Sequence, residues 1–264
     1  FLLVRNLLEI GASVNFITLV GSDSESSFVD SFEHPKLKKL IIRETGRRTT
    51  SKKRYWIDGY KLLQFDEFDN TPIKGNPYLQ ARSFIESSLL ETELLLVSDY
   101  RHGLMSGDLI TFCLNESKRQ NKDIYIDSQV SQSSSNHLAY KNATLFVLNE
   151  KEVASILDTK LSDPAIVFED LSRILNSNKI IIKLGERGSI ALINESVITT
   201  QALECDSIDT CGAGDAFFAM LAMSDIKAPE SALTSANRWA GLATTRLGAN
   251  PPALKDFLTR GLYE

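Results

Sequence analysis

The sequence predicts an α/β protein with a doubly wound parallel sheet and helices on both of its faces. Two observations carry this prediction. Short apolar runs, typical of strands that are buried on both faces of a parallel sheet, recur through the second half of the chain. Amphipathic segments with helical spacing lie between these runs, and parallel strands need crossover connections of this kind.

The expected elements can be placed in order along the chain. Residues 1–10 have the apolar spacing of a helix, and residues 13–20 alternate like a strand. Buried strands are expected at 94–97, 124–126, 145–148 and 180–183. Helices are expected near 79–90, 109–119, 153–157, 166–175 and 231–245. Ligands of such sheets bind beyond the carboxyl ends of the strands, where this chain has Asp99, Asp127, Asn149, Gly185 and Asp209.

The segment 37–68 has a different pattern and is expected to form a small β lid. Short β-like runs occur at 38–43, 49–57 and 62–65, and Asp58-Gly59 is a hairpin turn signal. The predicted division is therefore a core of residues 1–36 and 69–264 with a lid of residues 37–68. A short sheet with one exposed face is weakly stable alone, so we expect the lid to dock on substrate or on a second copy, as a homodimer.

The segment Asp209–Asp215 is the most informative part of the chain. It reads Asp-Thr-Cys-Gly-Ala-Gly-Asp and precedes an apolar run that predicts a buried helix. Its Gly-Ala-Gly amides would then lie at the positive end of a helix, where anions bind. An anion site beside the carboxylate of Asp215 suits phosphoryl transfer. The plain alternative for a bare Gly-x-Gly-Asp is a helix-capping Asp after a tight turn, and the longer string favours the anion site.

This string resembles the signature of the ribokinase-like (PfkB) carbohydrate kinases, which phosphorylate a sugar or nucleoside hydroxyl with ATP. Further matches follow in the family's order over nearly the whole chain. Asn149–Glu152 resembles its Asn-x-x-Glu element, and Lys183–Gly188 resembles its Thr-x-Gly-x-x-Gly nucleotide loop. Ala236-Asn237 and Gly248 resemble its C-terminal elements on the nucleotide side. The resemblance implies a ribokinase-like fold and ATP and Mg²⁺ as cofactors, and it leaves open a monovalent cation near the Asp209 loop.

The resemblance also implies roles for individual residues. Asp215 would be the catalytic base, and the amides of Gly212, Ala213 and Gly214 would hold the migrating phosphoryl group. Asn149 and Glu152 would organise Mg²⁺ through water, although a helix start rich in acidic residues is their plain alternative. The residues implied to bind the nucleotide are Lys183, Gly185, Gly188, Asp209, Thr210, Asn237 and Gly248. Lys183 stands where the family usually has Thr, and a satisfied helix-surface amide is an equal alternative for Asn237.

Within the family, the chain resembles the heptose-7-phosphate kinases of lipopolysaccharide core synthesis. The matching segments are 47–54, 62–66 and 98–103. The residues expected to contact the acceptor sugar are Asp23, Arg47, Lys52, Arg54 and Asp99. Solvated strand charges are the plain alternative for the three basic residues.

The acceptor side departs from the pattern of these relatives in four places. Leu2 falls where relatives have an Asn that holds the sugar hydroxyls, and Ser26 stands where a Gly is usual. Gln64 and Gln129 stand where the heptose kinases have cations. Relatives also carry an upstream strand with sugar contacts that the printed chain lacks, so we expect either that Phe1 is not the biological start or that these elements were lost.

Two further function classes can be weighed against the kinase. A catalytically weak sugar- or nucleotide-binding protein would explain the altered acceptor side. A nicotinamide-dependent dehydrogenase is excluded, because no Gly-x-Gly-x-x-Gly follows the first strand.

The composition of the chain limits the classes of partner that the protein is expected to bind. The net charge of −5 argues against nucleic acid, and no apolar run approaches a membrane span. The three cysteines form no CxxC pair, which favours the cytoplasm, and the three histidines have no metal-ligand spacing.

Overall fold

The computed structural model describes residues 1–57, 60–130, 134–158 and 163–259. Their centre is a six-stranded sheet in the order β10-β9-β8-β7-β6-β5. Four strands are parallel neighbours: β5 (Leu94–Asp99), β6 (Asp123–Ser128), β7 (Leu145–Asn149) and β8 (Lys179–Lys183). These are the four buried strands that the apolar runs predicted, and the parallel core is thereby confirmed.

Two antiparallel strands extend the sheet beyond the predicted set. β9 (Ser189–Ile193) pairs with β8, and β10 (Ser196–Thr200) pairs with β9 across a tight turn at Asn194-Glu195. Both turn residues have positive φ, as the primed turns of short hairpins require. The sequence lacks the Asn-Gly or Asp-Gly pair that usually signals such a turn, which is why the hairpin was not expected.

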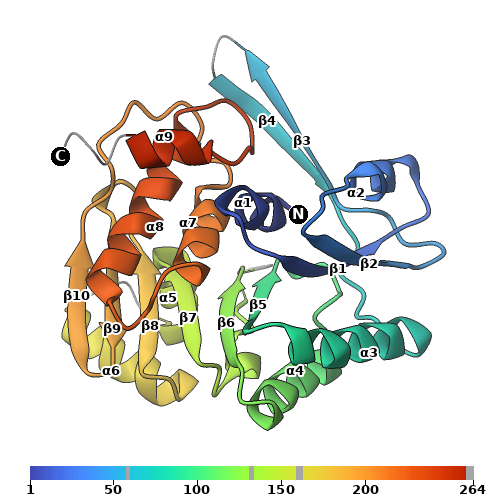
Figure 1. The fold of residues 1–264 in the computed structure, drawn as a ribbon, viewed down its shortest axis with the longest axis horizontal. Helices are drawn as coiled ribbons and strands as arrows, with labels where there is room; N and C mark the ends of the chain where they lie inside the picture. Colours follow the sequence, from blue (N-terminus) through green and yellow to red (C-terminus); the bar gives the residue numbers. More distant parts are fainter. Residues whose placement is uncertain (58–59, 131–133, 159–162, 260–264) are drawn as a thin grey trace.

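Helices cover both faces of the sheet, as predicted (Figure 1). One face carries α1 (Leu2–Ile10), α7 (Ala213–Ala222) and α8 (Pro229–Thr244), with α9 (Leu254–Thr259) packed on α8. The other carries α3 (Asn76–Glu91), α4 (Gly107–Arg119), α5 (Glu150–Leu157) and α6 (Pro164–Leu175). The middle of β7 shows why the runs are apolar throughout: Leu145, Phe146, Val147 and Leu148 are each 0% exposed.

Side chains at the helix starts explain where several of these helices begin. At the start of α4 the Ser106 hydroxyl accepts a hydrogen bond from the Leu109 amide. At the start of α6 the Asp163 carboxylate accepts one from the Ala165 amide, and Pro164 occupies the first helical position. Asn149 and Glu152 form a reciprocal capping box at the start of α5. These caps tie each helix to the carboxyl end of the preceding strand or loop.

A second, two-stranded parallel sheet lies beside the first. β1 (Val14–Val20) pairs along its whole length with β2 (Leu37–Arg43), and the short helix α2 (Ser27–Ser31) lies between them in sequence. We expected the run at 38–43 to belong to the lid, but it pairs with β1 instead. Burial explains the difference, because Ile42 is 1% exposed and belongs to the main hydrophobic core.

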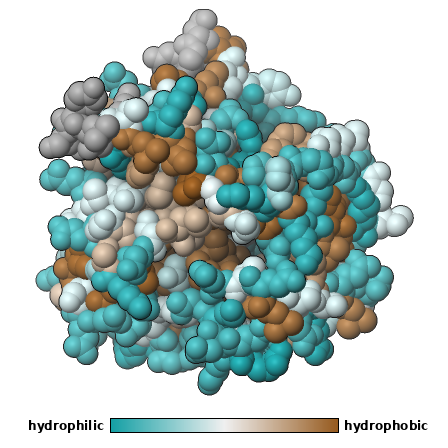
Figure 2. All heavy atoms as spheres, in the orientation of Figure 1, coloured by the Kyte–Doolittle hydropathy of each residue, from teal (hydrophilic) through white to brown (hydrophobic). Residues whose placement is uncertain are grey.

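The projecting part of the lid is one antiparallel hairpin of β3 (Ser51–Ile57) and β4 (Tyr60–Glu67). It extends away from both sheets in Figure 1. The turn signal at 58–59 falls outside the described residues. Large apolar side chains stay exposed on the hairpin, among them Tyr55, Ile57, Leu63 and Phe65 at 53–56%, and Figure 2 shows apolar atoms at this upper end of the molecule.

In the described part of the chain, no helix has the length and apolar character needed to cross a membrane.

Candidate active site

Polar and charged residues gather at the carboxyl ends of the parallel strands. Asp99 ends β5, Asp127 lies near the end of β6, Asn149 ends β7 and Lys183 ends β8. The N-terminus of α7 arrives at the same edge, because the Asp215 carboxylate on its first turn accepts a hydrogen bond from the Tyr100 hydroxyl just beyond β5. Residues from four neighbouring strands and one helix start therefore share one site.

The start of α7 offers free amides. Gly212 adopts a left-handed φ of 86°, a conformation in which an L side chain is strained, so this turn favours glycine. Ala213 donates its amide to the Thr210 carbonyl. Within the described residues, the amides of Gly212, Gly214 and Asp215 have no hydrogen-bond partner. Free amides at the positive end of a helix attract an anion.

The carboxylate of Asp215 is buried and accepts a hydrogen bond from Tyr100. Burial raises its pKa above the usual value, while the hydrogen bond from Tyr100 opposes that rise. Burial and the nearby Asp215 charge raise the pKa of Tyr100 well above its usual value, so the phenol keeps its proton. Tyr100 was not among the predicted site residues. The only signal for it was its place directly after a strand end.

A buried ion pair lies beneath the free amides. The Lys183 ammonium is 3.1 Å and 3.3 Å from the two carboxylate oxygens of Asp127. It also lies 3.5 Å from the position that a Cβ on Gly214 would occupy. Burial acts to lower the pKa of Lys183, but the charges of Asp127 and Glu152 outweigh it and raise the pKa. A permanent positive charge therefore stands directly under the turn.

The Asn149–Glu152 pair forms the capping box and offers no open metal ligand. Glu152 accepts from the Asn149 amide at 2.7 Å and from its side-chain Nδ2 at 2.6 Å. Burial raises the pKa of Glu152 to about 7. Among the described residues no group of three acidic, His or Cys side chains is arranged to hold a metal ion. The pair fits Mg²⁺ only through water, because Mg²⁺ retains several waters and is held mostly by phosphates.

The Asp209 carboxylate holds the loop that leads into α7. One oxygen accepts from the Cys211 amide at 2.9 Å and the other from the Gly248 amide at 3.1 Å. The site thus brings together Asp209 and Gly248, which lie far apart in the sequence. Thr210 is exposed beside them.

The predicted nucleotide loop is a tight turn after β8. Gly185 and Gly188 have φ values of 64° and 84°, and a Cβ on Gly188 would lie 2.1 Å from the Thr200 carbonyl oxygen. Glycine is required there by close backbone approach. Asn237 lies below the turn, where its Nδ2 donates to Ser189 Oγ and Thr200 Oγ1 at 3.0 and 2.8 Å. Its donor group is thus used within the protein, and the side chain is buried at 6% exposure and does not lie on the helix surface.

On the acceptor side, Asp23 has one unused oxygen. Its Oδ2 accepts from the Thr49 amide at 2.7 Å, and Thr49 Oγ1 accepts from the Gly21 amide at 2.9 Å. Hydrogen bonds from Thr49 lower the pKa of Asp23, so it is a charged acceptor. Its Oδ1 is buried with no partner among the described residues. An unsatisfied buried carboxylate oxygen can accept from a ligand hydroxyl.

Two residues that were expected to contact the acceptor sugar make hydrogen bonds within the protein instead. Arg47 is 7% exposed, and its guanidinium donates to Glu44 and to the backbone carbonyls of Asp69, Thr71 and His102. The hydrogen bonds of Arg47 therefore hold together the segments at the base of the lid, and its guanidinium does not face a ligand.

Asp99 is likewise satisfied internally. Its carboxylate is 4% exposed and accepts from the Arg101 amide and from Asn136 and Tyr140, each at 2.8 Å. Of the five residues expected to contact the acceptor, Arg47 and Asp99 are therefore kept from direct contact by burial and by their existing partners.

The lid strand β3 brings Lys52 and Arg54 toward the site. The Lys52 ammonium lies 5.9 Å from the centre of the Tyr100 ring and 3.9 Å from Asp66. Arg54 donates to Gln64 on β4 at 3.0 Å. His102 stacks between Tyr100 and Phe68, and burial lowers its pKa to about 4, so it is neutral.

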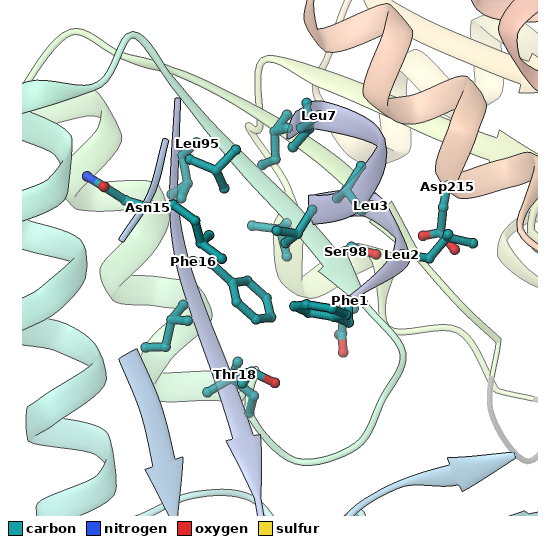
Figure 3. A pocket seen from close by; sticks show the side chains of 18 of the residues that line it. Phe1, Leu2, Leu3, Leu7, Asn15, Phe16, Thr18, Leu95, Ser98 and Asp215 are labelled. Atoms are coloured by element: carbon teal, nitrogen blue, oxygen red, sulfur yellow. The ribbon is translucent and has the colours of Figure 1, made fainter. Parts of the chain in front are cut away.

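A cavity of about 1220 Å³ opens onto this group of residues. Lys52, Arg54, Tyr100, Gly212 and Asp215 line one end of it. Figure 3 shows Asp215 and Ser98 at this end, with Leu2 beside Asp215. The rest of the cavity is lined by apolar side chains of α1, β1, α3 and β5.

Curated proteins similar to this chain include several that are named bifunctional protein HldE. The chain is 25% identical over 254 residues to the bifunctional protein HldE of Bradyrhizobium diazoefficiens, covering 92% of this chain and 51% of that protein. It is 27% identical over 253 residues to HldE of Campylobacter fetus, covering 93% and 54%. The chain thus spans about half the length of the curated relatives it matches.

Solved structures share the fold. Phosphofructokinase-2 of Escherichia coli in complex with potassium superposes with a TM-score of 0.78 at 17% identity, covering 99% of this chain and 85% of that one. Ribokinase from Giardia lamblia gives a TM-score of 0.75 at 17% identity, covering 98% and 88%. These likenesses confirm the ribokinase-like fold.

A family model described as pfkB family carbohydrate kinase matches residues 3–256, nearly the whole chain. The chain belongs to the pfkB family of carbohydrate kinases.

Proposed function

We propose that this chain transfers the γ-phosphoryl group of ATP to a hydroxyl of a sugar or sugar derivative. The observation that carries the proposal is the Asp215 carboxylate beside the free amides of Gly212 and Gly214, at the end of the large cavity. An acceptor hydroxyl at that end would have a base on one side and an anion-stabilising turn on the other.

Each group would have a distinct role in the transfer. Asp215 would take the proton of the attacking hydroxyl, and the rise of its pKa on burial makes it a stronger base than an exposed carboxylate. The amides of Gly212, Ala213 and Gly214 would bind the equatorial oxygens of the migrating group, after Ala213 exchanges its bond to Thr210. Lys183 would neutralise charge that develops there, because its ammonium lies under Gly214.

The nucleotide would lie over the two glycine turns. Gly185 and Gly188 would pass beneath its phosphates or ribose, and Asp209 with Gly248 would shape the loop next to it. Thr210 is exposed on that loop and available for a polar contact. Asn237 would act by holding the wall of this region through Ser189 and Thr200.

Metal ions would act mainly through the nucleotide. Mg²⁺ bound to ATP would supply charge neutralisation on the phosphates, and Asn149 with Glu152 would hold it through water. A monovalent cation near this loop would need backbone carbonyl oxygens as ligands, because both oxygens of the Asp209 carboxylate already accept hydrogen bonds from amides. The potassium complex of a fold neighbour motivates testing this ion.

For the acceptor, the relatives named HldE favour a heptose-like sugar. Asp23 has the free oxygen to accept a sugar hydroxyl, and Lys52 and Arg54 lie where an anionic substituent could bind. Gln64 replaces a cation of the heptose kinases and here bridges Arg54 and Asp66. A substrate with less negative charge than a sugar phosphate is consistent with this change.

The exposed apolar face of β3–β4 supports a homodimer through the lid. Tyr55, Ile57, Leu63 and Phe65 would be buried against a second hairpin. The same hairpin would close over the acceptor and exclude water from the reaction.

The test is an ADP-release assay with purified chain, ATP, Mg²⁺ and a panel of sugars, including heptoses with and without phosphate. We expect sugar-dependent ADP release that Asp215→Asn abolishes. The second candidate, a binding protein with little catalysis, is favoured by Leu2, which packs on Gly212 where a polar residue was expected. It predicts that a sugar binds by calorimetry while no sugar raises ADP release above background, and that result would overturn the kinase proposal.

A further inference from the structure

Three aromatic rings form a stack between the lid and the candidate base. The His102 ring lies 5.1 Å from the Phe68 ring at an interplanar angle of 24°, and 6.1 Å from the Tyr100 ring at 22°. Both separations are within the range of about 4.5–7 Å at which aromatic rings contact one another. The stack ends on Asp215, because the Tyr100 hydroxyl donates to that carboxylate.

His102 is in contact with residues next to both strands of the lid hairpin. Phe68 directly follows β4, and Thr50, whose Oγ1 lies 3.1 Å from His102 Nδ1, directly precedes β3. These two residues flank Ser51 and Glu67, the pair at the base of the hairpin ladder. A movement of the base of the hairpin therefore acts directly on the His102 ring.

The backbone next to these rings is held from two directions. The Arg101 amide donates to the carboxylate of Asp99 at the end of β5. The Gly103 carbonyl accepts from the Ile73 amide at 3.0 Å, on the segment that follows the lid. With the backbone anchored on both sides, contacts between side chains decide where the Tyr100 hydroxyl points.

We propose that His102 is a positioning residue, whose ring keeps the Tyr100 hydroxyl on Asp215 and links that contact to the position of the lid. This role rests on the proposed function, in which Asp215 is the base. In the arrangement of this structure the phenol donates to the carboxylate and weakens the base. Movement of Thr50 and Phe68 away from His102 loosens the stack and releases the carboxylate. The position of the lid thus sets the strength of the base.

The charge of His102 does not contribute to this effect near neutral pH. Burial lowers the pKa of His102 to about 4, and the Lys52 ammonium acts in the same direction. The carboxylates of Asp99 and Asp66 oppose this change without reversing it. Replacing the ring therefore removes no charge from the site at pH 7.

The other groups that face Asp215 stay constant when His102 is replaced. Burial and the charge of Asp127 raise the pKa of Asp215. The Tyr100 hydrogen bond, the amino group of Phe1 and the Lys183 ammonium lower it. A changed pKa of Asp215 in a His102 variant therefore reports the Tyr100 contact.

The test measures the pKa of Asp215 by NMR titration of its carboxyl carbon, a readout that needs neither ATP nor turnover. Asp215→Asn assigns the resonance. In His102→Ala we expect the pKa to rise by about one unit, the effect of losing a hydrogen bond to a charged group. His102→Phe keeps a ring in the stack and should leave the pKa unchanged. His34→Ala, just before β2, is the matched control.

A double variant separates positioning from a general loosening of the site. If His102 acts through Tyr100, adding His102→Ala to Tyr100→Phe raises the pKa of Asp215 no further. Additive effects of the two changes would overturn the proposal, as would an unchanged pKa in His102→Ala.

Phe68→Ala tests the link to the lid, because it removes the ring that the end of β4 contributes to the stack. It should also raise the pKa of Asp215, and an unchanged pKa would refute the link. If His102→Ala does not fold, Phe68→Ala decides the proposal, since the Phe68 ring is 43% exposed and its loss is tolerated more easily.

ADP-release assays then distinguish this proposal from the kinase proposal. With a sugar that is turned over, the acidic limb of the kcat profile should move upward in His102→Ala together with the pKa of Asp215. Sugar-dependent ADP release with an unchanged pKa refutes the role of His102 alone. A raised pKa in a chain that turns over no sugar supports the contact and refutes the kinase.

Discussion

The Lys183 ammonium lies 3.1 Å from Asp127 Oδ2 and 3.5 Å from where a Cβ on Gly214 would be. A single side chain thus connects the carboxyl end of β6 to the glycine turn of α7. Because Lys183 and Asp127 have side chains only 16% and 12% exposed, their charges depend on one another.

Replacing Lys183 with Met should therefore destabilise the protein by about 3 kcal/mol, because it leaves the carboxylate of Asp127 buried and unpaired. The measurement is urea unfolding at pH 7. Asp127→Asn introduced into the same background should recover most of the loss, since residue 127 then carries no unpaired charge. Equal losses that simply add in the double variant would contradict the coupling.

Asp215→Asn should lower kcat by on the order of a hundredfold or more while ATP still binds, because it removes the base and leaves the amide donors. ADP-release kinetics and ATP titration by calorimetry measure the two effects. Asp206→Asn is the matched control, since Asp206 is exposed on the preceding loop. A kcat close to that of the unmodified chain would remove Asp215 from its proposed role.

Tyr100→Phe tests the partner of that base through the pH profile. The hydrogen bond from Tyr100 lowers the pKa of Asp215, so its loss should raise that pKa further. The base then stays protonated to higher pH, and the acidic limb of the kcat profile should move upward. Tyr78→Phe on α3 serves as the control. If Tyr100 has only a structural role, Tyr100→Phe will change the stability of the protein and leave the acidic limb of the kcat profile at the same pH.

Glu152 should make stability fall with rising pH. Its pKa is about 7 in the folded chain against an ordinary 4.5, so the folded state keeps a proton that the unfolded state loses. The unfolding free energy should therefore decrease between pH 4.5 and 7, by about 3 kcal/mol from this group. Glu152→Gln retains a capping side chain and should lack this decrease, whereas the exposed Glu204→Gln should retain it.

The same Glu152→Gln variant tests whether Glu152 helps to bind Mg²⁺. If Glu152 contacts the waters of Mg²⁺, the Mg²⁺ concentration for half-maximal activity should rise more than the KM for the sugar. An unchanged Mg²⁺ titration would leave Asn149 and Glu152 with the capping role alone.

Closure of the lid can be followed by limited proteolysis. Trypsin sites at Lys53 and Arg54 lie on β3, and Lys53 is exposed. A sugar that binds should protect them, since the hairpin would dock over the acceptor. Binding that is confirmed by calorimetry but gives no protection would make the hairpin an edge structure without a lid role.

Much of the fold followed from local patterns. The four parallel strands are continuous apolar runs, and their order with the intervening helices can be read directly from spacing. The loop at Asp209–Asp215 was also readable, because two glycines, a carboxylate and a helical run are adjacent in the chain. The β9–β10 hairpin was missed, since its turn uses Asn194-Glu195 in place of a glycine pair.

The identity of the site residues depended more on the tertiary structure. Arg47 and Asp99 have the side chains of a ligand site, but long-range contacts to backbone carbonyls and to Asn136 and Tyr140 satisfy them. Tyr100 meets Asp215 across 115 residues of sequence, which no local pattern could indicate. Spacing along the chain sets which elements form and which residues end them. Whether a polar side chain is free for a ligand is decided by which distant groups fold against it, because its donors and lone pairs are few and distant partners can occupy them.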